Sequence, residues 1–337
     1  MKVGLIDVDR FTFPRMKFPN LALMKISAYH KAKGDSVEFC TDPMTRFDLV
    51  YQSKVFDETY SPDIDWFPNA DLVVKGGTGY NLTNKLSYKV EHIYPDYHLY
   101  DGTPAECKDT AYGFLTRGCP RHCGFCIVGD KEGLKSHKVA DLREFWHEHK
   151  KIKLLDANLL AARHSWKDCM SQLLIACNRY GSRIDFTQGL DARFCDWETV
   201  CWLNGLNVQR LHFAWDDPRQ DLTPHFETIN KHLIEKDRRK RIVYILTNYN
   251  STLEEDLYRI YTVESLGFDA DVRIFNKPNA PKDVKRLQRW CNNRIIHGAV
   301  PKYEDYKAYS CFLKYRSCMS SLKNKLLALL IHKNKAG

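Results

Sequence analysis

The sequence lacks any long uninterrupted apolar run, and this bears on where the protein works. At the amino terminus, Asp7 and Asp9 interrupt the apolar residues after only a few positions, so no secretory signal is recognisable. The longest late run, Leu326 to Ile331, is far short of the roughly 20 residues that cross a bilayer. We therefore expect a soluble, cytoplasmic protein with no membrane partner.

Internal repeats and low-complexity tracts are also missing, which excludes solenoids and long disordered segments. The chain has 337 residues, of which 44% are hydrophobic and 28% are charged, a mixture typical of a globular protein. At roughly 100–200 residues per domain, this length indicates two domains.

Strand and helix signals alternate in the first hundred residues. Residues 19–33 have a helical apolar pattern that ends before Gly34. Short runs of apolar and β-branched residues predict buried strands at 2–8, 37–40, 49–55 and 72–75. Because such alternation is typical of a parallel sheet, we expect a Rossmann-like domain over residues 1–108, including an irregular connection from residue 81.

A second alternating series follows and predicts six strand-and-helix units. Its expected strands are 111–116, 152–156, 184–188, 208–215, 242–247 and 272–275. Its expected helices are 141–149, 166–180, 197–203, 225–236, 253–266 and 281–291. Six units are too few for an eight-fold barrel, so residues 109–300 are expected to form a partial (β/α)6 TIM-type barrel. Residues 301–337 are expected to form a basic helical tail with Met319, Leu322, Leu326 and Leu329 on one face.

Three of the twelve cysteines are clustered. Cys119, Cys123 and Cys126 have the spacing C-x3-C-x2-C and directly follow the first strand of the second series. Thiolates are soft ligands that suit iron–sulfur clusters or zinc. Since iron–sulfur clusters are usually held by four cysteines, three thiolates leave one metal position open for a ligand. The residues alone leave two alternatives, a zinc site completed by His122 or another ligand, and a structural group of thiols.

The segment LTRGCPRHCGFC (residues 115–126), with Phe125 before the third cysteine, resembles the radical S-adenosylmethionine (SAM) superfamily. It is similar to the subgroup with a cobalamin-binding-like domain before the barrel, and residues 18–39 resemble part of that domain. The resemblance implies that Cys119, Cys123 and Cys126 bind three irons of a [4Fe–4S] cluster. It further implies that SAM chelates the fourth iron and that Phe125 lies against the adenine.

The same resemblance implies an enzyme that cleaves SAM reductively to a 5′-deoxyadenosyl radical, which then acts on a substrate. The substrate is unknown. A flavodoxin-like or ferredoxin-like electron donor is the implied partner.

Polar residues at the expected strand ends are candidates for contacts with SAM or substrate; ordinary loop capping or surface pairing explains any one of them equally well. We favour Gln188, Asp191 and Arg193, because three polar groups gather at one strand end. A carboxylate or amide can bind ribose hydroxyls, and an arginine can bind the SAM carboxylate in a bidentate manner. The other strand-end candidates are Asp156, Asn158, Asp216, Asp217, Thr247, Asn248 and Arg273.

Two further cofactors are disfavoured. The family's cobalamin binders carry a D-x-H-x-x-G signature, whereas the first strand is followed here by VDRFTFPRMKFPN without histidine. Only Cys40 and Cys107 precede Cys119, too few for a second amino-terminal cluster. Cys291, Cys311 and Cys318 are expected to be thiols without a metal.

The glycines of residues 76–79 indicate a tight turn or the close approach of a ligand.

The net charge of +9 is uneven. Residues 231–337 hold 22 Lys and Arg against 11 Asp and Glu, a local excess of +11, and include the basic stretch 236–241. A basic region can track phosphates, which makes a nucleic-acid binding or modifying protein an alternative function; an ordinary solvated lysine-rich face explains the same charge. A zinc-stabilised module without catalysis is the third alternative.

Overall fold

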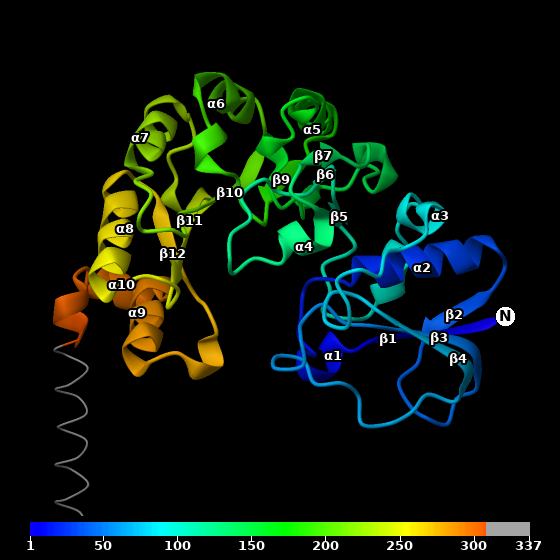
Figure 1. Ribbon diagram of the computed structural model, residues 1–337. Coiled ribbons are helices and arrows are strands. Elements are labelled where there is room, and N and C mark those ends of the chain that lie inside the picture. The colour runs from blue at the N-terminus through cyan, green and yellow to red at the C-terminus, as the bar shows by residue number, and fades with distance from the viewer. Residues whose placement is uncertain (308–337) are drawn as a thin grey trace, which may run out of the picture. The chain divides into compact units, whose positions relative to one another are not determined.

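The computed structural model describes residues 1–307 (Figure 1). The chain divides into two compact units. The first comprises residues 1–214, 221–242 and 266–268, and the second comprises 215–220, 243–265 and the chain from 269 onward. None of the described helices is long and apolar enough to span a bilayer.

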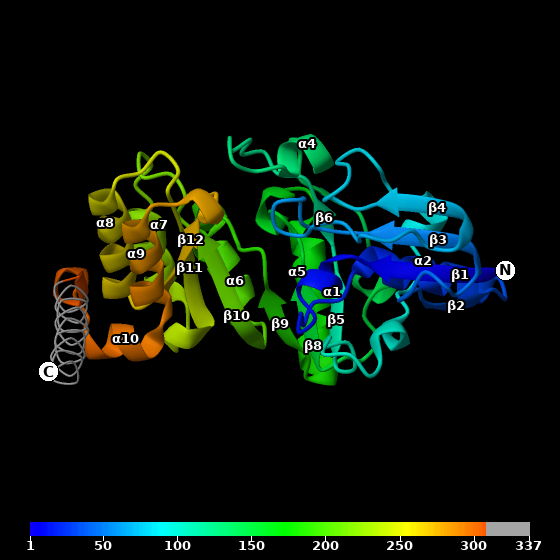
Figure 2. The same cartoon turned by 90° about the horizontal axis from the view of Figure 1, so that it is seen from below.

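The amino-terminal part is a parallel sheet with the strand order β2-β1-β3-β4, which Figure 2 shows side by side. Its pairings β1–β2, β1–β3 and β3–β4 are all parallel. The strands are β1 (Lys2–Asp7), β2 (Ser36–Phe39), β3 (Phe47–Ser53) and β4 (Ala70–Gly76). The four strands expected from the sequence are therefore present.

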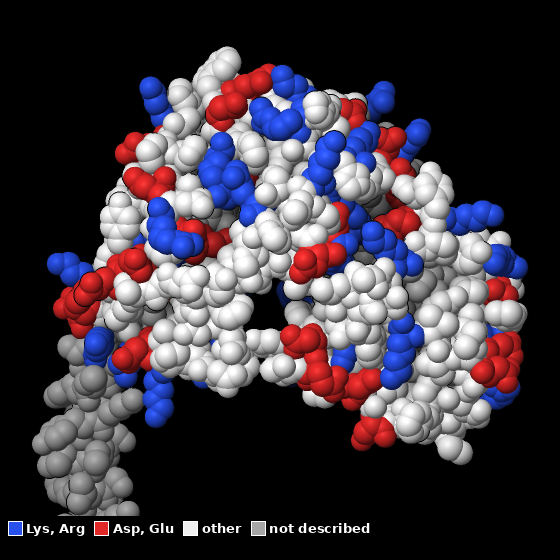
Figure 3. All heavy atoms as spheres, viewed as in Figure 1, with Lys and Arg blue, Asp and Glu red and all other residues white. Residues whose placement is uncertain are grey.

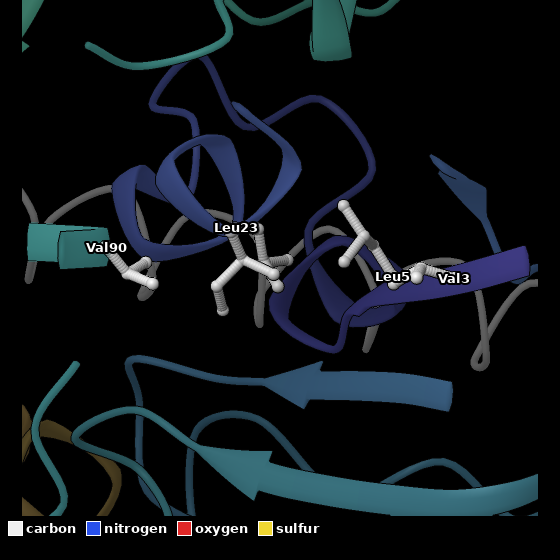
Figure 4. Close-up of a cluster of buried hydrophobic side chains, with 5 residues drawn as sticks. Val3, Leu5, Leu23 and Val90 are labelled. Atoms are coloured by element: carbon white, nitrogen blue, oxygen red, sulfur yellow. The ribbon is translucent and has the colours of Figure 1, made fainter. Parts of the chain in front are cut away.

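Helix α2 (Leu21–Ala32) covers one face of this sheet. Asn20 begins the helix, because its side-chain oxygen accepts a hydrogen bond from the Leu23 N–H at 3.2 Å. Leu23 and Ile26 then pack with Val3, Leu5 and Val90 in one buried cluster (Figure 4). Burying a side chain of this size contributes about 1.5–3 kcal/mol, so the cluster fixes the helix on the sheet.

The opposite face of the sheet is covered by a loop rather than by a helix. Ile6, Phe47 and Val50 are buried there against Ile64 and Trp66, which belong to the β3–β4 connection. Short helical segments accompany the sheet: α1 (Asp9–Thr12), α3 (Tyr88–Glu91) and η1 (Tyr97–Tyr100).

The second sheet has the strand order β12-β11-β10-β9-β8-β5. Pairings β5–β8, β8–β9 and β9–β10 are parallel. The strands are β5 (Thr110–Gly113), β8 (Lys151–Leu154), β9 (Arg183–Phe186), β10 (Val208–Ala214), β11 (Arg241–Thr247) and β12 (Asp269–Ile274). The helices are α5 (Trp166–Tyr180), α6 (Trp197–Asn204), α7 (Thr223–His232), α8 (Leu253–Ser265), α9 (Lys282–Asn292) and α10 (Arg294–Ala299). The predicted α/β fold, a Rossmann-like sheet followed by a partial six-stranded barrel, is confirmed.

The connection from β5 to β8 differs from the prediction. The helix expected at 141–149 is reduced to one 3-10 turn, η2 (Leu142–Glu144), although Asp141 and Glu144 form a capping box. Phe145 turns into the core and Glu148 has a φ of 60°, which breaks the helical path. The connection instead contains a hairpin of β6 (Thr116–Arg117) and β7 (His137–Lys138), and α4 (Val128–Glu132).

Three short 3-10 segments follow the barrel strands, η3 (Leu159–Ala161), η4 (Ala192–Phe194) and η6 (Lys277–Asn279), and η5 (Arg238–Lys240) precedes β11. The predicted tail helix with Met319, Leu322, Leu326 and Leu329 lies outside the described residues.

Candidate functional site

The three clustered cysteines lie on one loop between β6 and α4, which we call the cysteine loop (residues 118–127). Cys119 and Cys123 are half-buried, Cys126 is exposed, and the Cys126 N–H donates to the Cys123 carbonyl at 2.9 Å. Gly118 has a φ of 88°, and a Cβ there would lie 2.3 Å from the Lys135 carbonyl oxygen. Only glycine therefore fits where the chain enters this loop.

An ionic network joins the two ends of the cysteine loop, and we call it the loop clasp (Arg117, Glu132 and Glu91). Arg117 Nη1 lies 2.9 Å from Glu132 Oε1, and Glu132 Oε2 accepts from the Gly118 N–H at 3.1 Å. Arg117 Nη2 also lies 3.0 Å from Glu91 Oε1 on α3. Burial opposes ionisation of Glu91, but Lys25 and Arg117 outweigh it and lower the pKa of this carboxyl. The clasp therefore ties the loop to the amino-terminal sheet domain.

A second contact reaches α4 from the glycine-rich loop after β4. Lys131 Nζ donates to Thr78 Oγ1 at 2.7 Å. In that loop a Cβ at Gly77 would lie 2.4 Å from the Lys54 carbonyl oxygen, and one at Gly79 would lie 2.0 Å from the Phe56 carbonyl oxygen. The glycines thus allow the loop to pack on the chain that follows β3, which supports the tight-turn interpretation.

Asp191 is the centre of a polar cluster beside the cysteine loop, at the ends of β8 and β9. Arg121 Nε lies 2.7 Å from its Oδ2, and Arg193 Nε lies 2.6 Å from its Oδ1. Burial alone would raise the pKa of Asp191, but Arg193 and Arg121 lower it. Two guanidinium groups therefore share this one carboxylate.

Asn158 connects this cluster to the cysteines. Its Nδ2 lies 3.2 Å from Asp191 Oδ2 and 3.5 Å from Cys119 Sγ. Its Oδ1 is buried and has no hydrogen-bond partner. A buried acceptor without a partner costs about 1–3 kcal/mol, and this one belongs to a side chain that contacts both Asp191 and Cys119.

Asp156, which closely follows β8, bonds to the segment that leads into the cysteine loop. It accepts hydrogen bonds from Thr116 Oγ1 at 2.7 Å, from the Thr116 N–H and from the Leu115 N–H. Burial raises its pKa to about 6 despite these bonds. Asp156 therefore holds the backbone just before the cysteine loop.

The remaining predicted site residues lie in loops or bond to other residues of the chain. Phe125 is half-buried in the cysteine loop, and Gln188 is exposed in the turn after β9. In the second unit, Asp217 binds Arg219, Asn248 Nδ2 donates to the Phe275 carbonyl at 2.8 Å, and Arg273 binds Asp271. Thr247 is buried, and its hydroxyl lies 3.4 Å from the Arg273 carbonyl oxygen. Asp216 is half-buried, and its carbonyl accepts from the buried Arg259.

The other described thiols lie outside the cysteine loop. The thiols of Cys40, Cys107, Cys169, Cys177, Cys195 and Cys291 are buried, and Cys201 is exposed on α6. Within residues 1–307, no three His, Cys, Asp or Glu side chains, those of the cysteine loop included, gather as ligands of a single metal ion. His122, the suggested zinc ligand, is exposed with a φ of 44°. Cys311 and Cys318 lie outside the described residues.

The basic stretch 236–241 is largely engaged by its own chain. Arg241 is buried, donates to Asn230 Oδ1 at 2.9 Å, and lies 4.0 Å from the centre of the Phe268 ring. Arg239 binds Asp237, and Lys240 binds Glu235. On the face drawn in Figure 3, blue and red side chains are interspersed.

Comparisons with known proteins give a fold but no family. Neither a family profile nor a curated protein matches the sequence. Among solved structures, the chain is similar to the radical SAM methyltransferase TsrM from Kitasatospora setae, determined with cobalamin and a [4Fe–4S] cluster bound. The TM-score is 0.58 at 12% identity, over 81% of this chain and 75% of that one. At this identity the likeness shows a radical SAM-like fold alone.

Proposed function

We propose that this protein is a radical SAM enzyme whose [4Fe–4S] cluster is bound by Cys119, Cys123 and Cys126. The observation that carries the proposal is the position of these thiols on one loop, beside the polar ends of β8 and β9. In barrels of parallel strands, the loops at the carboxyl ends of the strands form the active site. The fold shared with a radical SAM methyltransferase is consistent with this position.

The residues present fit such a group. Three thiolates on a short loop supply soft ligands for three irons and leave one iron for another ligand. The neighbouring guanidinium groups of Arg121 and Arg193, both held by Asp191, are of the kind that binds a carboxylate such as that of SAM. The buried Asn158 Oδ1 is an acceptor for an N–H group such as the SAM amine.

A [4Fe–4S] cluster held by Cys119, Cys123 and Cys126 would supply one-electron reductive cleavage of the SAM sulfonium bond, releasing methionine and a 5′-deoxyadenosyl radical able to abstract a hydrogen atom from the substrate. The chain's own part is positional. The loop clasp fixes the loop, Asp191 orients both arginines, and Phe125 offers an aromatic surface for the adenine. A small flavodoxin-like or ferredoxin-like protein would deliver the electron.

The test is anaerobic reconstitution with iron and sulfide, followed by incubation with SAM and dithionite. We expect about four irons per chain, an electron paramagnetic resonance (EPR) signal that changes on adding SAM, and formation of 5′-deoxyadenosine. Cys123→Ala should lose all three, whereas Cys201→Ala, which removes an exposed thiol on α6, should retain them. A fully loaded cluster that binds SAM but never yields 5′-deoxyadenosine would refute the proposed reaction.

The amino-terminal domain, in this proposal, binds no cobalamin. At the carboxyl end of its sheet, polar side chains are engaged by the chain itself: Asp9 accepts from the Val55 N–H at 2.7 Å, and Asp7 accepts from Tyr100 Oη at 2.6 Å. When hydroxocobalamin is added to the unfolded chain during refolding, gel filtration should afterwards separate all of it from the protein. Co-elution of one cobalamin per chain would contradict this part.

Nucleic-acid binding stays a prediction, to be tested by the salt dependence of RNA and DNA affinity.

A further inference from the structure

Strand β4 forms one edge of the amino-terminal sheet. The order β2-β1-β3-β4 matches the first four positions of the doubly wound order 2-1-3-4-5. Within the described part of the chain, β4 has β3 as its strand neighbour in this sheet and no strand on its outer side. The position that a fifth strand takes in that arrangement is therefore available to another chain.

The outer part of β4 is unusually apolar for a sheet edge. Leu72 is 57% exposed and Val74 is 40% exposed, in a strand of seven residues. Natural edge strands are usually short, interrupted by proline or bulges, or protected by central charges. The centre of β4 reads Leu-Val-Val, with Asp71 and Lys75 outside it. Such an edge favours pairing with another strand.

The backbone of β4 is oriented for this pairing. The Phe47 N–H donates to the Asn69 carbonyl at 2.9 Å, so residue 69 faces β3. Peptide groups alternate along a strand, which turns the N–H and C=O groups of Leu72 and Val74 outward. On an antiparallel partner these two residues would form a hydrogen-bonded pair.

The sequence of β4 is complementary to itself in an antiparallel register centred on Val73. In that register Asp71 lies opposite Lys75 of the second copy, and Leu72 lies opposite its Val74. The charges therefore attract at both ends, and the exposed apolar side chains meet on one face. Within the described part of one chain, Asp71 pairs with Arg46 at an exposed site, and Lys75 pairs with the half-buried Asp63 and lies 5.3 Å from the centre of the Tyr80 ring. Exposed ion pairs contribute about 0–1 kcal/mol, so a second copy can compete for Asp71 in particular.

We propose that two copies of this protein associate through antiparallel pairing of their β4 strands, which joins the two amino-terminal sheets into one. The two-fold axis passes beside Val73, as the self-complementary contact of a symmetric dimer requires. This inference stands independently of the proposed radical SAM function.

Sedimentation velocity of the full chain over a range of concentrations tests the association. We expect wild type to form a dimer whose dissociation constant rises at least tenfold in Leu72→Lys, because each dimer then places two charges against apolar side chains. Circular dichroism and thermal unfolding establish that the variant folds, and Leu72 is exposed enough for the substitution to be tolerated. Ile295→Lys, which changes an exposed apolar residue on α10, is the matched control and should dimerise like wild type.

A charge exchange tests the register. Asp71→Lys alone places lysines opposite Lys75, and Lys75→Asp alone places carboxylates opposite Asp71, so each variant should be mainly monomeric. An equimolar mixture of the two restores opposite charges at both positions and should form a heterodimer. A wild-type monomer at all concentrations, a dimer that Leu72→Lys leaves intact, or a mixture that stays monomeric would overturn the proposal.

Discussion

At the scale of single residues, Asp191 does the most to organise the site. It binds two arginines and an amide, from three different segments of the chain. Under the proposed function, Arg193 contacts the SAM carboxylate. Arg193→Ala should then weaken SAM binding about 10- to 100-fold, because a charged hydrogen bond contributes about 1.5–3 kcal/mol. Equilibrium dialysis with the reconstituted protein measures this.

Two further variants serve as controls for that measurement. Arg193→Lys keeps the charge but loses the planar fork, so it should recover only part of the affinity. Arg239→Ala removes a similar arginine–aspartate pair on η5 and should bind SAM like wild type. Unchanged affinity in Arg193→Ala, with a complete cluster, would remove Arg193 from the binding site.

Asp7 gives a prediction of pH dependence. Burial raises its pKa to about 6, although Tyr100 and Arg10 partly offset this. The folded chain therefore binds a proton more tightly than the unfolded chain, in which the pKa is about 3.8. The stabilisation by the protonated carboxyl is complete below about pH 4 and is lost as the pH rises through 6. Relative to Asp7→Asn, wild type should lose up to about 3 kcal/mol of unfolding free energy between pH 4 and 7.

Urea unfolding of both proteins over this pH range measures the difference. Titrations of all other groups, including the buried Asp156, are common to both chains and cancel in the comparison. Parallel curves for wild type and Asp7→Asn would show that Asp7 titrates normally in the folded protein.

Of the three residues favoured from the sequence because strand ends converge in parallel sheets, Asp191 and Arg193 lie in the polar cluster beside the cysteine loop, whereas Gln188 is exposed in the turn after β9. The sequence did not indicate Arg121, the second arginine on Asp191, which lies 70 residues away along the chain. Its only signal is a basic residue inside the cysteine spacing. Nor could it show that Asp156 is engaged by Thr116, since a buried and a ligand-binding aspartate look alike in sequence.

At the scale of elements, the loop clasp joins the two ends of the cysteine loop. Arg117→Ala removes contacts to Glu132 and Glu91, which lie in α4 and α3. A loss of about 1–2 kcal/mol changes an equilibrium about 5- to 30-fold. We therefore expect the reconstituted variant to release iron to a chelator at least fivefold faster than wild type.

Lys17→Ala is the control for that experiment. It removes an ion pair with Glu106, outside the cysteine loop and the clasp, and should release iron at the wild-type rate. Arg117→Lys should be intermediate, because lysine can bind one of the two carboxylates. Equal rates in wild type and Arg117→Ala would show that the loop keeps its shape without the clasp.

The strands and most helices could be predicted because the spacing of their apolar residues and the residues at their ends indicate the same element. The helix expected at 141–149 could not, because its capping box is real but Phe145 is drawn into the core beside Gly113, where a Cβ would lie 2.2 Å from the Phe145 ring. Tertiary packing overrides local propensity at that point. Strands β6 and β7 have two residues each, too few to show the alternation of apolar and polar residues that identifies a strand.

At the scale of the whole molecule, the boundary expected near residue 108 separates two sheets but crosses a tightly packed region. Tyr97, from the amino-terminal side, is buried; its Oη donates to the Phe145 carbonyl at 2.6 Å and accepts from the Tyr112 N–H at 3.0 Å. Phe18 also packs edge-to-face on Tyr112. Both partners of Tyr97 belong to the segment expected to begin the barrel domain.

Residues 109–337 expressed alone should therefore fail to fold cooperatively. Without residues 1–108, Tyr112 and Phe145 lose their apolar cover, and the Tyr112 N–H loses its acceptor, which costs about 1–3 kcal/mol for that group alone. Thermal unfolding and binding of a hydrophobic dye measure the outcome, with the full chain as reference. In the full chain, Tyr97→Phe should lower the unfolding midpoint, because it removes the same hydroxyl from both partners. A truncated chain that unfolds sharply at the midpoint of the full protein would show that the barrel needs no support from the amino-terminal sheet.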